Sequence, residues 1–434
     1  MLSDRFLWGV STASYQIEGA VAEDGRGRSI WDTFAHTEGR IANGDTGDVA
    51  CDHYHRYAED VELMAGLGVD AYRFSIAWPR VLPTGAGTVN HKGLDFYSRL
   101  VDGLLERGID PVATLFHWDL PQELQDKGGW LDRDTAYRFA DYAAVVADAL
   151  GDRVRMWITL NEPFVHTVMG HAYGTHAPGL TLGFESFPTI HHQLLGHGLA
   201  VRALRSRTGS PISIANNYSP VVLCGETDAD QAAAYAYDAL HNRLFTEPLL
   251  GRGYPPGFEF PVEEGDLDII ATPIDALGVN YYNPTGVRAP QSDETGLPFE
   301  TVELDGYART DFGWPVVPDG LGDLLTRLHT DYRLPLYVTE SGCSYAESPD
   351  DRRRVEYLRD HIAVLDRVRA SGVDVRGYFV WSLLDNFEWA EGYAQRFGLV
   401  HVDFPTGTRT PKSSYAWYRD HIAAARLGGG EDQA

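Results

Sequence analysis

Two glutamates at the ends of apolar runs are the first candidates for chemistry in this chain. Glu162 follows the run M-W-I-T-L-N at residues 156–161 and precedes Pro163. Glu340 follows the run L-Y-V-T at residues 336–339 and precedes Ser-Gly. A short continuous apolar run is typical of a buried strand, and proline cannot donate the next hydrogen bond of a central strand. Each carboxylate is therefore predicted at the tip of a rigid strand.

The two apolar runs belong to a pattern that recurs along the chain. A short apolar run is followed each time by a stretch with helical periodicity, and glycine often ends that stretch. Alternating strands and helices predict an α/β protein, either a doubly wound sheet or a closed barrel. Strands are predicted at 6–11, 71–76, 111–116, 156–160, 212–216, 276–282, 336–339 and 377–381, and helices at 56–67, 91–107, 135–150, 192–205, 228–250, 321–332, 352–370 and 413–425.

The number of units and the chain length favour the barrel. No glycine-rich phosphate loop of the dinucleotide-binding type follows any predicted strand. We therefore predict a single (β/α)8 TIM barrel over residues 1–426 and a disordered tail at 427–434. Two long connections, 283–319 and 386–411, are expected at the carboxyl ends of the strands, where they would elaborate the functional face.

Composition excludes several classes of function. The 434 residues carry a formal net charge of −26, which argues against nucleic acid or an anionic membrane as a partner. No apolar window is long enough to cross a membrane, and the first residues do not resemble a secretory signal. Three cysteines without a C-x-x-C pair, and histidines without an H-E-x-x-H frame, predict no metal site. We expect a cytoplasmic protein.

Polar and aromatic residues follow most of the predicted strands, where a barrel places its active site. Glu162 and Glu340, on the fourth and seventh strands, are predicted to face each other across the barrel mouth. One carboxyl group that donates a proton, opposite a second that attacks or activates water, is what glycoside hydrolysis needs. The nucleophile would be the glutamate supported by the charge of Arg73 and a hydrogen bond from Tyr282. The other candidates are His117, Trp118, Asp119, Asn161, Asn280, Tyr281, Trp381, Asp385, Asn386, Glu388 and Trp389.

A set of ordered motifs runs along nearly the whole chain. They are F-L-W-G-V-S-T-A-S-Y-Q-I-E-G at 6–19, Y-R-F-S-I-A-W-P-R at 72–80, T-L-F-H-W-D-L-P at 114–121, T-L-N-E-P at 159–163, G-V-N-Y-Y at 278–282, Y-V-T-E-S-G at 337–342 and W-S-L-L-D-N-F-E-W at 381–389. In this order the motifs resemble the family-one glycoside hydrolases, the β-glucosidase family.

The resemblance implies a retaining double displacement that needs no metal or organic cofactor. Glu340 would attack the anomeric carbon while Glu162 protonates the leaving oxygen, and the carboxyl groups would lie about 5–5.5 Å apart. Arg73 and Tyr282 match the pair that supports the nucleophile, and Asn161 matches the partner of the sugar 2-hydroxyl. The remaining hydroxyls and the ring face of the sugar would be held by Gln16, His117, Glu388, Trp389 and Trp381, with Asn280 and Trp118 in the same pocket.

Two positions depart from the commonest family pattern. Ser341 stands where Asn is usual after the nucleophile, and we expect catalysis to survive this change. Phe164 stands where Trp usually follows N-E-P, so its ring is predicted to border the aglycone side and to affect leaving-group preference. Trp314 is predicted to border the same entrance, with packing of its long loop as an equal alternative. The loop at 171–179 is predicted to shape the pocket rim.

The predicted substrates are small glycosides, and the oligomeric state stays open. We expect hydrolysis of terminal non-reducing β-D-glucosyl residues of neutral glycosides or cello-oligosaccharides, with β-galactosides and β-fucosides as further candidates. One alternative is a 6-phospho-β-glycosidase. Such relatives grip the phosphate with Ser and Lys after the last strand, whereas this chain has Glu388 and no lysine there. A second alternative, a non-catalytic sugar-binding barrel, is disfavoured by the presence of both glutamates.

Overall fold

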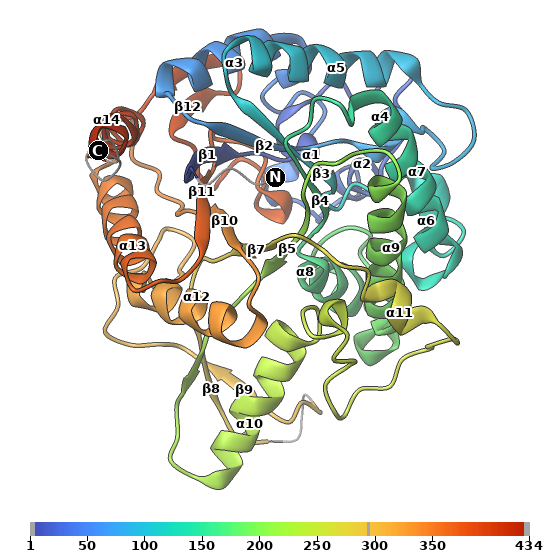
Figure 1. Ribbon diagram of the computed structural model, residues 1–434, viewed down its shortest axis with the longest axis vertical. Helices are drawn as coiled ribbons and strands as arrows, with labels where there is room; N and C mark the ends of the chain where they lie inside the picture. The colour runs from blue at the N-terminus through green and yellow to red at the C-terminus, as the bar shows by residue number, and fades with distance from the viewer. Residues whose placement is uncertain (1–4, 293–295, 429–434) are drawn as a thin grey trace.

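Parallel strands close into a barrel in the part of the chain that the structure, a computed structural model, describes: residues 5–292 and 296–428. Within that part, eight strands follow one another around the barrel in the order β1-β11-β10-β7-β5-β4-β3-β2 (Figure 1). The predicted closed barrel is confirmed, and the doubly wound sheet is excluded. The strands are β1 Leu7–Ser11, β2 Ala71–Ser75, β3 Asp110–Phe116, β4 Met156–Asn161, β5 Ile212–Asn217, β7 Leu277–Asn280, β10 Leu336–Ser341 and β11 Val375–Trp381.

The two strands that carry the glutamates lose regular pairing just before their ends. The register between β10 and β7 shifts between Val338 and Glu340. The register between β4 and β5 shifts between Ile158 and Asn161. Irregularities of this kind are frequent at barrel rims and active sites, because they turn a side chain away from the direction that regular alternation would give it. Sequence periodicity alone could not have located them.

Helices surround the barrel and match most of the predicted ranges. In α5, for example, Leu94, Tyr97, Val101 and Leu104 are buried along one face, as the spacing predicts. Gly68 ends α3 in a left-handed conformation with φ 76°, which glycine adopts without steric cost. The long outer helices are α3 His53–Leu67, α5 His91–Glu106, α7 Asp134–Leu150, α9 Pro188–Arg205, α12 Pro318–Tyr332, α13 Arg352–Ala370 and α14 Ser413–Gly428.

The helix predicted over 228–250 is wrong in extent. α10 covers only Asp228–Asp238, and a π-helical turn, η5, follows at Ala239–Arg243. The Asn242 side chain there bonds the backbone N–H and C=O of Ser219, at 3.0 and 2.9 Å, a long-range contact that local periodicity does not report. Pro248 then begins a separate turn, η6 Pro248–Leu250, because proline cannot continue a regular helix.

Both long connections contain short strands that the sequence did not predict. The connection after β7 holds β8 Thr285–Arg288 and β9 Glu300–Val302, which form a sheet with β6 Val221–Leu223. This sheet and α10 lie beyond the ring of helices (Figure 1). The connection after β11 holds the hairpin of β12 Val400–Asp403 and β13 Thr408–Pro411. The short helices and turns are α1 Ser14–Ile17, α2 Ile30–Ala35, α4 Trp78–Val81, α6 Gln122–Gln125, α8 Pro163–Thr167, α11 Asp266–Ile270, η1 Ala42–Gly44, η2 Gly129–Leu131, η3 Val168–Ala172, η4 Gly183–Ser186 and η7 Trp389–Glu391.

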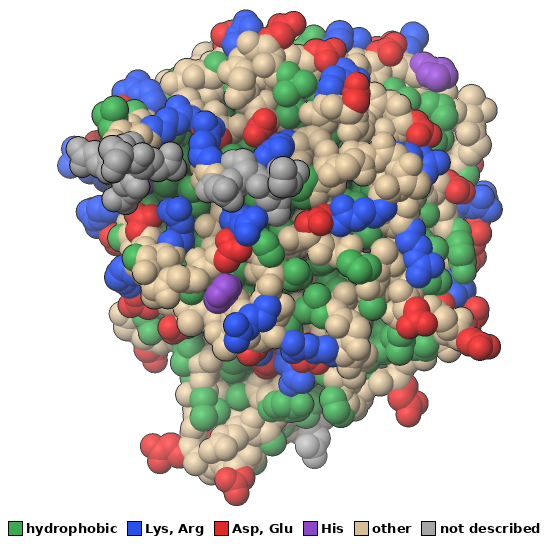
Figure 2. Space-filling model, in the orientation of Figure 1, with side chains coloured by type: hydrophobic (Ala, Val, Ile, Leu, Met, Phe, Trp, Pro, Cys, Tyr) green, Lys and Arg blue, Asp and Glu red, His purple; other side chains and the backbone are tan. Residues whose placement is uncertain are grey.

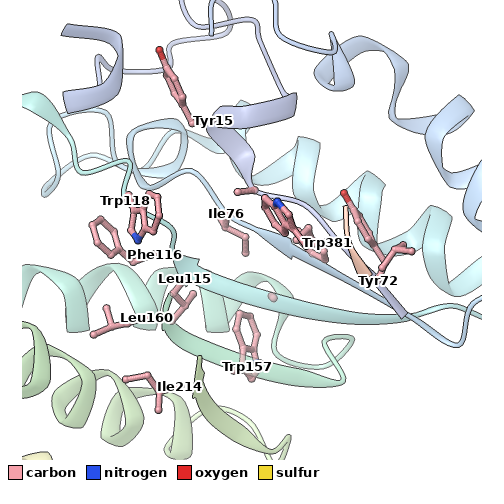
Figure 3. Packing of buried hydrophobic residues seen from close by; sticks show 14 of the residues in the cluster. Tyr15, Tyr72, Ile76, Leu115, Phe116, Trp118, Trp157, Leu160, Ile214 and Trp381 are labelled. Atoms are coloured by element: carbon pink, nitrogen blue, oxygen red, sulfur yellow. The ribbon is translucent and has the colours of Figure 1, made fainter. Parts of the chain in front are cut away.

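The main apolar core lies between the barrel and its helices. Trp157, Leu160 and Ile214, on the neighbouring strands β4 and β5, are fully buried in it, and Figure 3 shows part of this packing. Burial of one large apolar side chain contributes about 1.5–3 kcal/mol to stability, so the core fixes the strand ends firmly. A separate small cluster lies beneath α10 and is formed by Ala233, Tyr237, Val287 and Phe299.

The outer surface and the C-terminus bear on the remaining predictions. Figure 2 shows acidic and basic side chains interspersed over one face of the molecule. Of the helices in the described residues, none is both long and apolar enough to cross a membrane. Helix α14 extends through Leu427 to Gly428, so the first two residues of the predicted tail are helical; residues 429–434 lie outside the described part.

Candidate active site

A cavity of about 530 Å³ lies at the carboxyl ends of the barrel strands and brings the two glutamates together. Glu162 follows β4, Glu340 lies in β10, and both line this cavity. The predicted convergence of strand-end residues is seen directly in its lining. Of the predicted site residues, His117, Trp118, Tyr282, Trp314, Trp381, Glu388 and Trp389 also line it.

Glu340 is bonded through both of its carboxylate oxygens. Arg73 Nη1 lies 2.6 Å from Oε1, and the Tyr282 hydroxyl donates to Oε2 at 2.7 Å. Glu340 and Arg73 are 3% and 1% exposed, so this ion pair is almost shielded from water. A buried carboxylate keeps its charge only when it is paired and hydrogen-bonded, and both conditions hold here. The two partners are those that the sequence proposed for a nucleophile.

Arg73 also links Glu340 to a buried amide network, whose residues Asn161 and Asn280 do not themselves line the cavity. Its Nη2 donates to Asn161 Oδ1 at 2.6 Å, and Asn280 Nδ2 donates to the same oxygen at 3.0 Å. The Asn161 amide nitrogen lies 2.9 Å from His117 Nε2. Each contact joins residues that lie on, or directly follow, different barrel strands, so the barrel itself positions these groups. Ser341, the departure from the family pattern, is buried and lies 3.4 Å from the Tyr357 hydroxyl.

Glu162 occupies a different environment. It has φ 44°, in the left-handed region that non-glycine residues rarely adopt, and it directly precedes α8. Its Oε1 accepts from Asn280 Nδ2 at 2.8 Å and from Asn217 Nδ2 at 3.2 Å. Burial, and then the charge of Glu340, raise the pKa of Glu162 to about 8. At neutral pH this carboxyl group is therefore mostly protonated and can donate a proton.

Two buried polar atoms that have no partner among the described residues lie at or next to the cavity: His117 lines it, and Gln16 lies behind Glu388, which lines it. Gln16 Nε2 donates to the backbone carbonyl of Phe387 at 2.9 Å, so Oε1 of the same amide points away from that carbonyl. Gln16 Oε1 and His117 Nδ1 are buried, and nothing in the described part of the chain bonds to them. Burial, and then the charge of Arg73, lower the pKa of His117 well below its usual value, so this ring is neutral. Buried orphan atoms of this kind suit a ligand rich in hydroxyl groups.

Glu388 and aromatic rings lie beside these two residues. Glu388 lies 3.3 Å from Gln16 Nε2, and burial followed by the charge of Glu340 raises its pKa to about 8. Trp389 and Trp118 have φ 50° and 79°, and such strained backbones cluster at ligand sites. The His117 ring stacks against Trp389 and Trp381 at centroid distances of 5.7 and 5.9 Å.

Trp314 and Phe164, both predicted on the aglycone side, lie in different places relative to the cavity. Trp314 does line the cavity, with its ring 5.2 Å from that of Tyr282. Phe164 is not among the lining residues; its ring stacks on His241 at 3.9 Å, and His241 faces the cavity. The expectation that Phe164 borders the cavity directly is therefore corrected: it lies one ring behind. The loop at 171–179 contributes Thr175 and His176, so its predicted place at the rim is confirmed.

Sequence reasoning missed several residues of this cavity. Asn217 ends β5 and bonds Glu162, and the rule used for the other strand ends would have found it. His241 gave no signal because it stood inside a stretch that was predicted as one helix. Phe312 lies in the long connection after β7, whose path periodicity does not predict. Among the described residues, no group of three or more histidine, cysteine or acidic side chains is arranged to hold a metal ion.

A closed parallel barrel with an arginine-paired carboxylate and a protonated carboxyl group in one strand-end cavity belongs to the class of barrel glycosidases. Residues 1–426 match the family described as Glycosyl hydrolase family 1. The thermostable β-glucosidase B of Thermobispora bispora is 48% identical over 99% of this chain and 92% of its own length. A bifunctional β-D-glucosidase/β-D-fucosidase of Bifidobacterium breve is 45% identical over 96% and 97%. The chain therefore belongs to glycosyl hydrolase family 1.

Solved structures agree with this assignment. The family 1 β-glucosidase from Thermotoga maritima superposes with a TM-score of 0.93 at 44% identity, over 97% of both chains. The family resemblance drawn from the seven motifs is thus confirmed, and the protein is a glycosidase.

Proposed function

We propose that this glycosidase is a retaining β-glucosidase. The observation that carries the proposal is the asymmetry of the two glutamates. Glu340 is ion-paired and hydrogen-bonded through both oxygens, whereas Glu162 has a pKa raised to about 8 by burial and by Glu340. Two carboxyl groups with separated roles are what a double displacement requires. The relatives described as β-glucosidases support the choice of sugar.

The two half-reactions use the same pair of residues. Glu340 attacks the anomeric carbon as Glu162 transfers its proton to the departing oxygen, which leaves a glycosyl-enzyme and an ionised Glu162. That carboxylate then takes a proton from water, and the water oxygen displaces Glu340 from the sugar. Asn161 is proposed to bond the sugar 2-hydroxyl. Because the side chains supply both the nucleophile and the proton, the reaction needs no metal or organic cofactor.

The preferred substrates are proposed to be neutral glycosides. Gln16 Oε1 and His117 Nδ1 are free for sugar hydroxyls, with Glu388, Trp389 and Trp381 beside them. A 6-phosphate would meet the buried carboxyl group of Glu388, and the connection at 386–411 has no lysine to bind it. Both features disfavour the 6-phospho-β-glycosidase alternative. β-Fucosides, on which the Bifidobacterium breve relative acts, and β-galactosides are proposed as further substrates. The paired glutamates argue against a non-catalytic barrel.

The decisive experiment follows hydrolysis of an aryl β-glucoside by proton NMR. The first sugar released should be the β anomer, and aryl β-glucoside 6-phosphate should be cleaved far more slowly. Release of the α anomer would exclude a retaining mechanism, and faster cleavage of the phosphorylated sugar would restore the alternative. If neither substrate were cleaved by folded protein, the proposal would be wrong.

Two further properties are proposed on indirect grounds. A single catalytic domain at 1–426 is supported by the family match over the same residues. A cytoplasmic location is supported by the use of only three cysteines.

A further inference from the structure

Both hydrogen bonds that Glu162 receives reach one of its two oxygens. Asn280 and Asn217 each donate an amide N–H to Oε1, at 2.8 and 3.2 Å. No donor of the described residues bonds Oε2. In a protonated carboxyl group the carbonyl oxygen is the better acceptor, so two N–H donors on Oε1 place the acidic proton on Oε2. The amide pair therefore decides which oxygen can protonate a leaving group.

The two amides are oriented by different means. The Asn280 oxygen accepts from the Thr339 hydroxyl at 2.7 Å, and both residues lie on barrel strands, β7 and β10. Asn217 is half-buried at the end of β5, and its oxygen has one partner in the described chain, His241 Nε2, at 2.8 Å. If the Asn217 amide turned over, its oxygen instead of its N–H would face Glu162. His241 thus holds the only orientation that leaves Oε1 with two donors.

The proton of His241 must lie on Nε2 for this to work. Burial lowers the pKa of His241 to about 3, so the ring is neutral and carries a single N–H. Its Nδ1 lies 2.9 Å from the Tyr237 hydroxyl, which can donate to it. The tyrosine proton on Nδ1 places the ring proton on Nε2, facing Asn217. Phe164, stacked on the same ring at 3.9 Å, fixes the ring plane.

We propose that His241, oriented by Tyr237, is a positioning residue for the acid/base glutamate. Acting through Asn217, it keeps two donors on Glu162 Oε1 and so keeps the reactive proton on Oε2. This inference rests on the proposed retaining function of Glu162.

The inference also gives a task to the small sheet outside the barrel. Tyr237 lies on α10 and packs in the apolar cluster with Ala233, Val287 and Phe299. Its hydroxyl lies 3.0 Å from that of Thr285, at the start of β8. The sheet thus holds the phenol in place beside His241. An element far from the reacting carbon thereby reaches Glu162.

The experiment compares leaving groups across four variants in the full chain. They are His241→Leu, Asn217→Ala, Tyr237→Phe and the matched control Tyr235→Phe, whose exposed phenol lies on the same helix but outside the chain of bonds. An alkyl β-glucoside needs protonation of its leaving oxygen, whereas a 2,4-dinitrophenyl β-glucoside does not. Both substrates are measured for each variant, together with the pH profile and the melting temperature.

The variants should separate by substrate. His241→Leu should lower kcat/KM for the alkyl glucoside about tenfold and leave the first step with the dinitrophenyl glucoside nearly unchanged, because only acid catalysis is impaired. Losing a donor to Glu162 should also move the basic limb of the profile upward by about half a pH unit. That limb reflects the other groups facing Glu162 as well, namely Glu340, Arg73 and Asn280, and Asp238 near His241. Tyr237→Phe should change kcat/KM for the alkyl glucoside and the basic limb in the same directions. Tyr235→Phe should match the unmodified protein in both.

A double-mutant cycle provides the second criterion. Because His241 acts through Asn217, adding His241→Leu to Asn217→Ala should cost little more. Equal losses for both substrates, an unmoved basic limb or additive effects would overturn the inference. If His241→Leu fails to fold, Tyr237→Phe decides the question. The quantity compared is then its loss of kcat/KM for the alkyl glucoside relative to its loss for the dinitrophenyl glucoside. An unmodified protein that cleaves neither glucoside would instead refute the proposed function.

Discussion

The two sides of the cavity are built from different kinds of structure. On the side of Glu340, the proposed nucleophile, Arg73, Asn161, Asn280 and Glu340 come from four barrel strands and bond one another directly. On the other side, the proposed leaving-group side, His241 lies in a π-helical turn, and Trp314 and Phe312 lie in a long connection. In the proposed reaction, the groups placed against the reacting carbon thus stand on rigid strands. The wall proposed to meet the variable half of the substrate is formed by segments that can change without disturbing the barrel.

The two glutamates show the same contrast at the level of charge. Glu340 faces an arginine that belongs to the barrel network. Within the described residues, the donors to Glu162 are neutral amides, one on a strand and bonded to Thr339, the other bonded to His241 outside the barrel. The proposed function therefore gives one residue type two roles because its surroundings differ.

The largest expected effect lies on the barrel side. Glu340→Gln removes the nucleophile, so kcat should fall on the order of 10⁴-fold or more for every leaving group. The measurement is the initial rate with a series of aryl β-glucosides. Glu356→Gln, an exposed change on α13, serves as the control and should leave all rates unchanged. A loss that depended strongly on the leaving group would contradict the role of Glu340.

The next effect should depend on the substrate. In Glu162→Gln the amide cannot donate a strong acid proton, so kcat/KM for alkyl glucosides should fall on the order of 10³-fold. The first step with a 2,4-dinitrophenyl glucoside should be nearly spared, and a glycosyl-enzyme should accumulate because the base for the second step is missing. Rapid-mixing kinetics would show this as a burst. Added azide, which needs no base, should restore turnover and yield the β-glycosyl azide.

The barrel side was also the side that the sequence predicted well. Strands and their ends are marked locally, by apolar runs and by the polar residue that follows, so Glu162, Glu340, Arg73 and Tyr282 could be named before the structure was known. Their roles at the reacting carbon stay predictions. The motif order predicted the family, which the match over residues 1–426 confirms.

The leaving-group side resisted prediction for physical reasons. The break after α10 depends on the bonds between Asn242 and Ser219, which lie in different segments. The same break determines where His241 lies, and therefore that Phe164 lies behind His241. β6, β8 and β9 are three or four residues long, too short for alternation to be recognised. Tertiary contacts, rather than local preference, decide this wall.

A third prediction concerns pH and the acid/base group alone. Glu162 must be protonated in the first step, and its pKa is raised to about 8. kcat/KM should therefore be high below pH 8 and fall as pH rises through that value, about tenfold per unit beyond it. Glu388, also with a pKa raised to about 8, titrates in the same range. The limb should persist in Glu388→Gln and vanish in Glu162→Gln; the reverse result would assign it to Glu388.

The smallest expected effect tests whether the two sides are independent. Phe164→Trp restores the residue common in the family and enlarges the ring stacked on His241 at 3.9 Å. The larger ring should press on the leaving-group wall and change the ratio of kcat/KM between an aryl glucoside and cellobiose about two- to fivefold. The hydrolysis rate of the preformed glycosyl-enzyme should not change, because the leaving group has gone and the strand-end residues are untouched. Phe184→Trp, at a residue 56% exposed, is the matched control. An equal change in glycosyl-enzyme hydrolysis would mean that the loop-built wall and the barrel network are coupled rather than separate.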